Sequence, residues 1–367
     1  MPRAERRQPV DWACWALRHP QHLPGLTATQ WEPVVQQARR ADVLARIAVS
    51  MQDTGQLQAV PDAPRAHLQA ALQVVRAQHA EVRLEARQIA VALRGLGIPV
   101  LLLKGAAYVV AGLPAARGRL FSDTDILVPR AALREVEGAL MLHGWLGAHL
   151  DAYDQRYYRQ WMHELPPMSH LTRGSTLDVH HNILPLTVRR PPDADRLLMQ
   201  SQPVPGADGL RMLGRADMVL HSMTHLFHND DLSHGLRDLS DLDLLLRAFA
   251  DDTSLWSQLV ERAQVLHLQR PLAYGLWATR ELLGTPVPDA ALVQAGQAAA
   301  LDVMTEPMRS LWRRALRTPH ADAALPGQAL AVLLLYVRAH WLRMPPLQLA
   351  YHLGYKAWKR LSRTTVT

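Results

Sequence analysis

Two aspartates separated by one residue constrain the fold more than any other feature of this chain. Asp123 and Asp125 stand directly before the apolar residues 126–128. Side chains at positions i and i+2 of an extended segment point to the same side, so this segment predicts a strand with two carboxylates side by side. Because like charges so close repel each other, we expect a cation between them.

The residues before this acid pair predict a strand, a turn and a helix. The apolar run Ile98–Leu103 after Gly97 is typical of a buried strand. Gly105 then allows the backbone to approach a ligand closely, and residues 106–110 can begin a helix whose free amide groups face an anion. Lys104 lies at this turn, where it either contacts a phosphate or is a solvated lysine at the strand end.

Hard oxygen ligands beside a cationic side chain suit Mg²⁺ carrying a phosphate. Arg119 lies four residues before Asp123 and supplies such a cation. Residues 169–171 and Thr176–His180 predict a hairpin whose second strand carries a further carboxylate, Asp178. Asp178 shares one face of its strand with His180; it either joins the acid pair or is a solvated hairpin residue. The pattern indicates phosphoryl or nucleotidyl transfer.

These residues resemble the DNA polymerase β-like nucleotidyltransferase superfamily. The most similar branch is its bacterial uncharacterised nucleotidyltransferase family, which has Lys-Gly before a helix and Arg-x-x-(Ser/Gly)-Asp-x-Asp-hydrophobic-Leu-Val after it. Ala106 departs from the wider superfamily, which has Ser or Gly there. The resemblance covers roughly residues 95–288. The matching positions are Lys104, Gly105, Arg119, Ser122, Asp123, Asp125, Asp178 and His180.

The resemblance implies a Mg²⁺-dependent enzyme with two ions, or Mn²⁺ in their place. It would move a nucleoside monophosphate from a triphosphate such as ATP to an acceptor hydroxyl and release pyrophosphate. The acceptor stays open between a sugar, a small metabolite, a protein side chain and an RNA end. Asp123 and Asp125 would hold both ions, and Asp178 would hold the catalytic ion and activate the acceptor. The implied triphosphate contacts are Lys104, Gly105, Arg119 and Ser122.

Two further residues have less direct roles. His180 is expected to orient a carboxylate or the acceptor rather than bind Mg²⁺, which prefers oxygen ligands. Arg237 either contacts the nucleotide or pairs with Asp241, four residues later on a helix, as a structural clamp. His221, His225 and His228 share one helix face. A zinc site there would need a further ligand, so these histidines carry no assigned role.

The expected fold is of α+β class, with a polymerase β-like core of a small mixed sheet and helices between two helical regions. We predict an N-terminal helical cap over residues 1–95, the core over 96–210, and a helical domain with a basic tail over 211–367. Helices are expected at Trp31–Ser50, Leu68–Leu93 and Ala131–His143. Residues 147–167 are expected to form a loop or lid over the site.

Charge and composition leave the partner open. The net charge of +7 is carried by residues 301–367, which hold ten Lys and Arg against three acids. This tail either binds nucleic acid or is a packed helix with solvated cations. Two alternatives therefore remain, a toxin-like tRNA nucleotidyltransferase and a non-catalytic nucleotide- or RNA-binding protein. The tail cations concerned are Arg338, Arg343, Lys356, Lys359, Arg360 and Arg363.

Cysteine content and hydropathy exclude two classes. Cys14 is the only cysteine, so a disulfide scaffold within the chain and a cysteine-based zinc site are excluded. The longest apolar stretch, 329–337, is too short to span a bilayer. We therefore expect a cytoplasmic protein without a membrane span.

Overall fold

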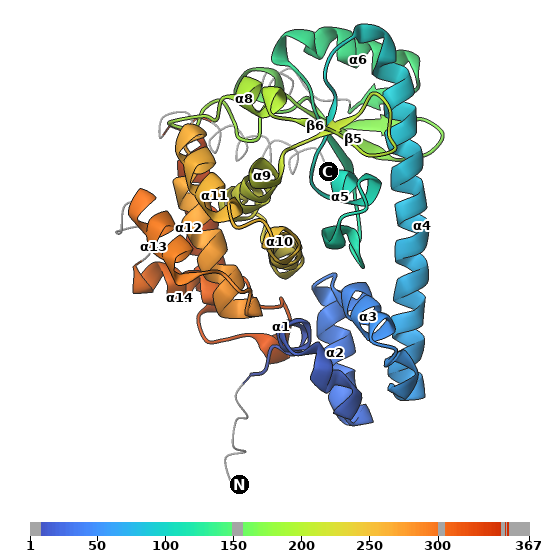
Figure 1. The fold of residues 1–367 in the computed structure, drawn as a ribbon, viewed down its shortest axis with the longest axis vertical. Coiled ribbons are helices and arrows are strands. Elements are labelled where there is room, and N and C mark those ends of the chain that lie inside the picture. The colour runs from blue at the N-terminus through green and yellow to red at the C-terminus, as the bar shows by residue number, and fades with distance from the viewer. Residues whose placement is uncertain (1–8, 149–156, 300–304, 346–348, 350, 352–367) are drawn as a thin grey trace, which may run out of the picture.

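The computed structural model describes residues 9–148, 157–299, 305–345, 349 and 351. Three N-terminal helices, α1 (Trp12–Arg18), α2 (Ala28–Arg40) and α3 (Leu44–Asp53), lie together at one end of the molecule. The long helix α4 (Asp62–Leu93) runs from this end to the sheet at the other (Figure 1). The N-terminal helices are therefore connected to the sheet by one straight element.

Helix α4 confirms the predicted amphipathic stripe. Leu68, Leu72, Val82 and Ile89 are buried on it, and the chain leaves the helix through Gly97, whose φ of 62° lies in the left-handed region. The single helix predicted over residues 31–50 is wrong. The chain breaks there into α2 and α3, because Asp42 between them has a φ of 56°, which a continuing helix does not allow.

A mixed seven-stranded sheet forms the other half of the molecule, which confirms the predicted combination of helices with a mixed sheet. The strand order is β3-β4-β5-β2-β1-β7-β6. β2 pairs in parallel with β5, and β1 in parallel with β7, while the other pairs are antiparallel. The strands are β1 (Leu101–Leu102), β2 (Thr124–Leu127), β3 (Trp145–Gly147), β4 (Met168–His170), β5 (Thr176–His180), β6 (Gln202–Pro203) and β7 (Arg211–Met212).

Two strand predictions compare directly with this sheet. The hairpin expected around residues 169–180 is confirmed as the antiparallel pair of β4 and β5. The strand expected over 98–103 is shorter, although its hydrogen bonding continues from Val100, whose carbonyl accepts from Arg211, to Leu103, whose amide donates to Asp125. β7 belongs to this sheet although it follows residue 210, where the core was predicted to end.

The remaining helices either flank the sheet or, in the C-terminal part of the chain, group together on the side of the molecule away from α4 (Figure 1). α9 is buried along most of its length and packs against α10, α11 and α12. None of the helices in the described part of the chain is long and apolar enough to cross a membrane. These helices are α5 (Lys104–Val110), α6 (Leu133–Leu142), α8 (Ala194–Met199), α9 (Arg215–His228), α10 (Gly235–Phe249), α11 (Leu255–Val265), α12 (Gln269–Ala278), α13 (Asp289–Ala298), α14 (Glu306–Ala315) and α15 (Gln328–Arg343).

One continuous hydrophobic core joins these parts. Trp31 in α2, Ile126 in β2 and Phe227 in α9 belong to the same cluster of buried side chains. The α6 helix begins at Leu133 rather than Ala131, after a short 3₁₀ turn. This shared core holds segments that are far apart in the sequence against one another, and the site described below takes residues from several of them.

Candidate active site

Two of the predicted catalytic carboxylates are direct neighbours across the parallel pair β2 and β5. Asp125 is the register partner of Asp178. Residues in register on adjacent strands share one face of the sheet, so the two side chains emerge together. Asp123, just before β2, is exposed. All three aspartates line one cavity of about 280 Å³, together with Lys104 and His180.

Asp125 is the most deeply held of the three. It is 8% exposed, and it accepts a hydrogen bond from His180 Nε2 at 3.0 Å. Lys104 Nζ lies 3.3 Å from its other carboxylate oxygen. Burial alone would raise the pKa of Asp125, but Lys104 and the hydrogen bond from His180 hold this pKa well below its ordinary value. The carboxylate is therefore ionised and fixed in orientation.

Asp178 has the opposite environment. Its Oδ1 atom is buried and has no hydrogen-bond partner among the described residues. Burial raises the pKa of Asp178 to about 7, and the charges of Asp125 and Glu164 add to the rise. A buried carboxylate oxygen without a partner costs free energy unless a cation or a donor meets it. Asp178 thus marks the point where the cavity lacks positive charge.

His180 lies between two carboxylates. Its Nε2 faces Asp125, and its Nδ1 lies 3.3 Å from Glu164 Oε2. Burial would lower the pKa of His180, but the hydrogen bond to Asp125 and the charge of Glu164 raise it. With both ring nitrogens engaged, His180 orients the Asp125 carboxylate, which is the contact expected for a residue that supports a metal ligand.

Glu164 and His163 were not found as site residues in the sequence. Glu164 pairs with His180 through an isolated backbone bridge, which brings residues 162–164 into the cavity wall. His163, Glu164 and His180 place one ligand atom each within 4.8 Å of one another, an arrangement able to hold a metal ion. Residues 149–156 of the predicted lid lie outside the described residues. No motif in the sequence links Glu164 to β5.

Lys104 begins α5 in a strained conformation. Its φ of 41° lies in the left-handed region, which is unusual for a residue other than glycine. The preceding residue Leu103 is tied to β2 by a hydrogen bond that its backbone amide donates to the Asp125 carbonyl. These constraints aim the Lys104 side chain at Asp125, so the turn delivers a cation to the acid pair.

Residues from the C-terminal half form the opposite wall of the cavity. His225 and His228 reach it from α9, and Arg343 reaches it from the last turn of α15. Arg343 Nη1 lies 2.8 Å from Asp230 Oδ1. Burial lowers the pKa of His225 well below its ordinary value and that of His228 to about 3, so both imidazoles are neutral near pH 7. His221 is buried but does not line the cavity.

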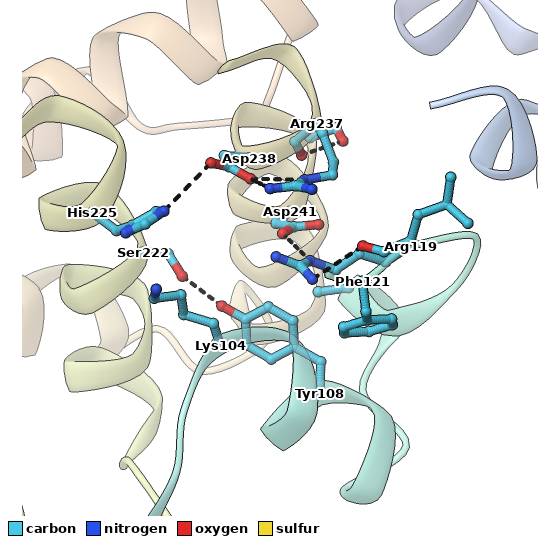
Figure 2. A network of polar contacts seen from close by, with 12 residues as sticks. Lys104, Tyr108, Arg119, Phe121, Ser222, His225, Arg237, Asp238 and Asp241 are labelled. Atoms are coloured by element: carbon cyan, nitrogen blue, oxygen red, sulfur yellow. Dashed lines mark hydrogen bonds and ion pairs between the residues drawn. The ribbon is translucent and has the colours of Figure 1, made fainter. Parts of the chain in front are cut away.

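Arg119 is committed to a buried ion pair instead of the cavity. Its Nε donates to Asp241 Oδ2 at 2.6 Å, and Arg46 Nη2 donates to the other Asp241 oxygen at 2.8 Å. Figure 2 shows Arg119 beside Asp241 with its guanidinium over the Phe121 ring, and Tyr108 of α5 hydrogen-bonded to Ser222 of α9. This clamp fixes the segment before Asp123 against α10. A direct nucleotide contact by Arg119 would require breaking it.

The predicted clamp between Arg237 and Asp241 is wrong in its partner. Arg237 donates to Asp238 at 2.9 Å, and Asp238 lies 3.8 Å from His225 (Figure 2). Asp241 is already bound by two arginines from α3 and the segment before β2, which leaves it no free oxygen. Because α3 approaches α10 only in the folded chain, the helical spacing alone did not reveal this.

Gly105 and Ser122 were expected to contact the triphosphate, but neither lines the cavity that the three aspartates share. A side chain at Gly105 would collide with Phe121 at 2.2 Å and with Arg119 Nη1 at 2.3 Å, so this glycine is required for packing. Ser122 is exposed and lines a second cavity next to α4. That second cavity also includes Asp123.

The cavity fits a divalent cation with a preference for oxygen ligands. The acids on its wall outnumber Lys104 and Arg343, and each of these cations is already beside a carboxylate. The unpartnered oxygen of Asp178 and its raised pKa indicate the same deficit of positive charge. Carboxylate oxygens are the ligands that Mg²⁺ and Mn²⁺ bind in proteins. The acidic side chains are Asp123, Asp125, Glu164, Asp178 and Asp230.

Comparison with known protein families shows which class of protein has this fold and this acid cluster. A family model described as uncharacterised nucleotidyltransferase matches residues 27–284, and the chain belongs to this family. The protein is therefore a nucleotidyltransferase. No curated protein and no solved structure matches the chain. The matched segment includes every aspartate discussed above, whereas Arg343 lies beyond it.

Proposed function

We propose that this nucleotidyltransferase is Mg²⁺-dependent and moves a nucleoside monophosphate from a triphosphate to an acceptor hydroxyl, releasing pyrophosphate. The observation that carries the proposal is the pairing of Asp125 with Asp178, whose Oδ1 is buried without a partner, in the cavity that Asp123 also lines. A core of the polymerase β-like kind is the architecture that this placement supports.

Within the proposal, each carboxylate has a separate role. Asp123 and Asp125 would hold two Mg²⁺ ions, and Asp178 would share the one nearer the acceptor. Bound there, the ions would neutralise the triphosphate and lower the pKa of the acceptor hydroxyl. His180 keeps the Asp125 carboxylate in one orientation through its 3.0 Å hydrogen bond. The fixed charges of the site need no rearrangement during the reaction, which is how such sites lower the barrier.

The triphosphate would lie on the side of Lys104 and Arg343, the two permanent cations of the cavity. Lys104 also begins α5, where free backbone amide groups favour an anion. Arg343 is anchored by Asp230 and, through Nη2, lies 3.4 Å from Asn229 Oδ1, so its guanidinium is held ready at the wall. Arg119 would support the site indirectly, by positioning the segment before Asp123.

The proposal is tested by nucleotide transfer with matched aspartate variants. The protein is incubated with each α-labelled nucleoside triphosphate, Mg²⁺ and cell extract, and the labelled product is identified. Asp123→Ala is expected to reduce transfer by roughly 100- to 1,000-fold, the loss typical of removing one preorganised electrostatic contact. Because Asp123 is exposed, the unfolding free energy of the variant should differ from that of the parent protein by less than about 0.5 kcal/mol.

Asp208→Ala is the control, since Asp208 is exposed in a turn outside both cavities. Full transfer by the Asp123 variant would refute the metal assignment. Transfer that survives complete removal of divalent cations by EDTA would refute the dependence on Mg²⁺.

A further inference from the structure

A second cavity adjoins the first and has no role in the function proposed so far. It has a volume of about 460 Å³ and lies between α4, the segment 121–124 and the turn of the β4–β5 hairpin. Volumes of this size are typical of small-molecule sites. Its wall includes Glu81 and Glu85 of α4, Ser122, and the hairpin residues Arg173 and Ser175.

The two cavities meet at a catalytic carboxylate. Asp123 lines both of them. Thr176 on β5 lines the second cavity, whereas Asp178, two residues later on the same face of that strand, lines the first. In phosphoryl-type transfer the attacking and leaving oxygens are roughly in line on opposite sides of the phosphorus. A phosphorus atom beside Asp123 would therefore have one group on each side.

The charges of the two cavities indicate which cavity takes the leaving group and which takes the attacking group. The cations Lys104 and Arg343 are in the first cavity and suit the departing pyrophosphate. In the second, Arg173 is the one cationic side chain among the described lining residues, and it pairs with Glu85. Among the residues described, Glu81 has no ion pair, so this cavity keeps an excess of negative charge even when Asp123 holds a metal ion. The second cavity therefore repels phosphates, attracts cationic molecules and admits neutral ones.

A buried polar atom in the second cavity also lacks a partner. Ser175 Oγ is inaccessible to solvent and has no hydrogen bond within the described chain. The hydroxyl side chains of Ser122 and Thr176 line the same cavity. Serine and threonine hydroxyls both donate and accept, so this wall suits a ligand rich in hydroxyl groups.

We propose that the second cavity is the acceptor subsite and that the acceptor is a small hydroxyl-bearing molecule without phosphate, neutral or positively charged. This inference rests on the proposed function. The acceptor oxygen forms a bond to the α-phosphorus, and the bond from that phosphorus to the oxygen bridging to the β-phosphate breaks. Pyrophosphate leaves with the electron pair, and the hydroxyl proton passes to solvent.

The charge of the subsite is tested with a thiol placed in it. Leu84 on α4 lines the second cavity and is 42% exposed, while Val74 on the same helix is 51% exposed and lines neither cavity. The native Cys14 gives little background, because burial raises the pKa of its thiol to about 12. The variants L84C and V74C are treated with trimethylammonium-ethyl and sulfonatoethyl methanethiosulfonate.

We expect the rate with the cationic reagent, divided by the rate with the anionic reagent, to be roughly tenfold higher in L84C than in V74C. This factor corresponds to a difference of about 1.4 kcal/mol between the interactions of the two reagents with the local potential. Adding Glu81→Gln to L84C should bring the ratio down toward that of V74C. An equal ratio in the two single variants, or faster reaction with the sulfonate in L84C, would overturn the proposed acceptor class.

The same modification tests the assignment to the acceptor. After L84C is modified, Mg²⁺-ATP binding should stay within about twofold, while transfer from α-labelled ATP to the dialysable molecules of a cell extract should fall at least tenfold. Lost ATP binding would show that the second cavity holds the nucleotide, and unchanged transfer would show that it holds no substrate. Labelling of RNA, or of an acceptor that itself carried a phosphate group before transfer, would also overturn the inference. Absence of transfer in the unmodified parent would instead count against the proposed function.

Discussion

Asp241 and Asp178, two aspartates with buried carboxylate oxygens, have opposite surroundings. Asp241 on α10 is 4% exposed and satisfied by Arg46 and Arg119, one on each carboxylate oxygen. Asp178 on β5 is flanked by other carboxylates and keeps one buried oxygen without a partner. Both carboxylates have at least one buried oxygen, and the number of cations beside each carboxylate makes the difference. A fully paired acid stabilises the fold, whereas an acid short of cations marks a site for one.

The strongest test of this comparison is turnover by Asp178→Asn. If Asp178 serves only the ion nearer the acceptor, the variant should bind Mg²⁺ and triphosphate but transfer at least about 1,000-fold more slowly, which corresponds to a barrier higher by ~4 kcal/mol. Equilibrium binding and single-turnover rates, measured side by side, separate the two steps. Lost triphosphate binding would show that the division of roles among the carboxylates is wrong.

Asp241→Asn should have its main effect on stability. Breaking a buried ion pair leaves an uncompensated charge, which costs about 3 to 5 kcal/mol. Urea unfolding should show this loss, with Arg247→Gln as the control. Arg247 is exposed and pairs with the partly buried Asp243 four residues earlier on the same helix, and such i, i+4 pairs contribute only about 0.3 to 0.5 kcal/mol. Normal stability combined with lost transfer would place Asp241 in the chemistry and remove the contrast with Asp178.

Metal-free stability should depend on pH through Asp178. Its pKa is raised from 3.8 to about 7 in the folded chain, so the unfolded chain ionises first as the pH increases. The folded state therefore loses stability between about pH 4 and pH 7, by roughly 2 to 4 kcal/mol at 1.36 kcal/mol for each unit of pKa.

Asp178→Asn removes this titration. In EDTA the variant should match the parent near pH 4 and be more stable than the parent at pH 8, as measured by urea unfolding at both values. A variant that is less stable than the parent at pH 8 would mean that Asp178 is paired in solution.

The smallest effect is expected at the basic tail. Arg338 stacks over Tyr274 and donates to the Phe227 carbonyl, and Arg343 pairs with Asp230, so both are engaged by the folded body. Lys356, Lys359, Arg360 and Arg363 lie outside the described residues.

If the tail bound RNA, the log-log slope of affinity against salt would be about −0.7 for each phosphate contacted, and changing Lys356, Lys359 and Arg360 to Gln would flatten it by about two to three units. We expect no such change, and RNA binding too weak to detect at physiological salt. A flattened slope would favour a tRNA acceptor over a small molecule.

Local spacing accounts for the parts of the structure that the sequence predicted. The stripe on α4 and the β4–β5 hairpin follow from periods of 3.6 and 2 residues, which a chain displays without knowledge of its fold, whereas the mixed sheet was implied by the family resemblance. The same reasoning placed Asp123 with Asp125, and Asp178 with His180, on shared strand faces, whereas a third carboxylate beside the acid pair was implied by the family resemblance.

The break between α2 and α3 was missed, because no glycine or proline marks Asp42 as the residue that leaves the helix.

The sequence by itself determined that Asp125 and Asp178 stand on strands and that a helix follows the turn at Lys104 and Gly105. Only the tertiary structure decided which groups lie beside each charged side chain. Arg46 reaches Asp241 across 195 positions of sequence, and Arg343 reaches Asp230 across 113. Glu164 reaches His180 through a bridge that no periodic pattern encodes. The physical reason is that backbone preference acts over a few residues, whereas the energy of a charge depends on every group that packing brings within a few ångströms of it.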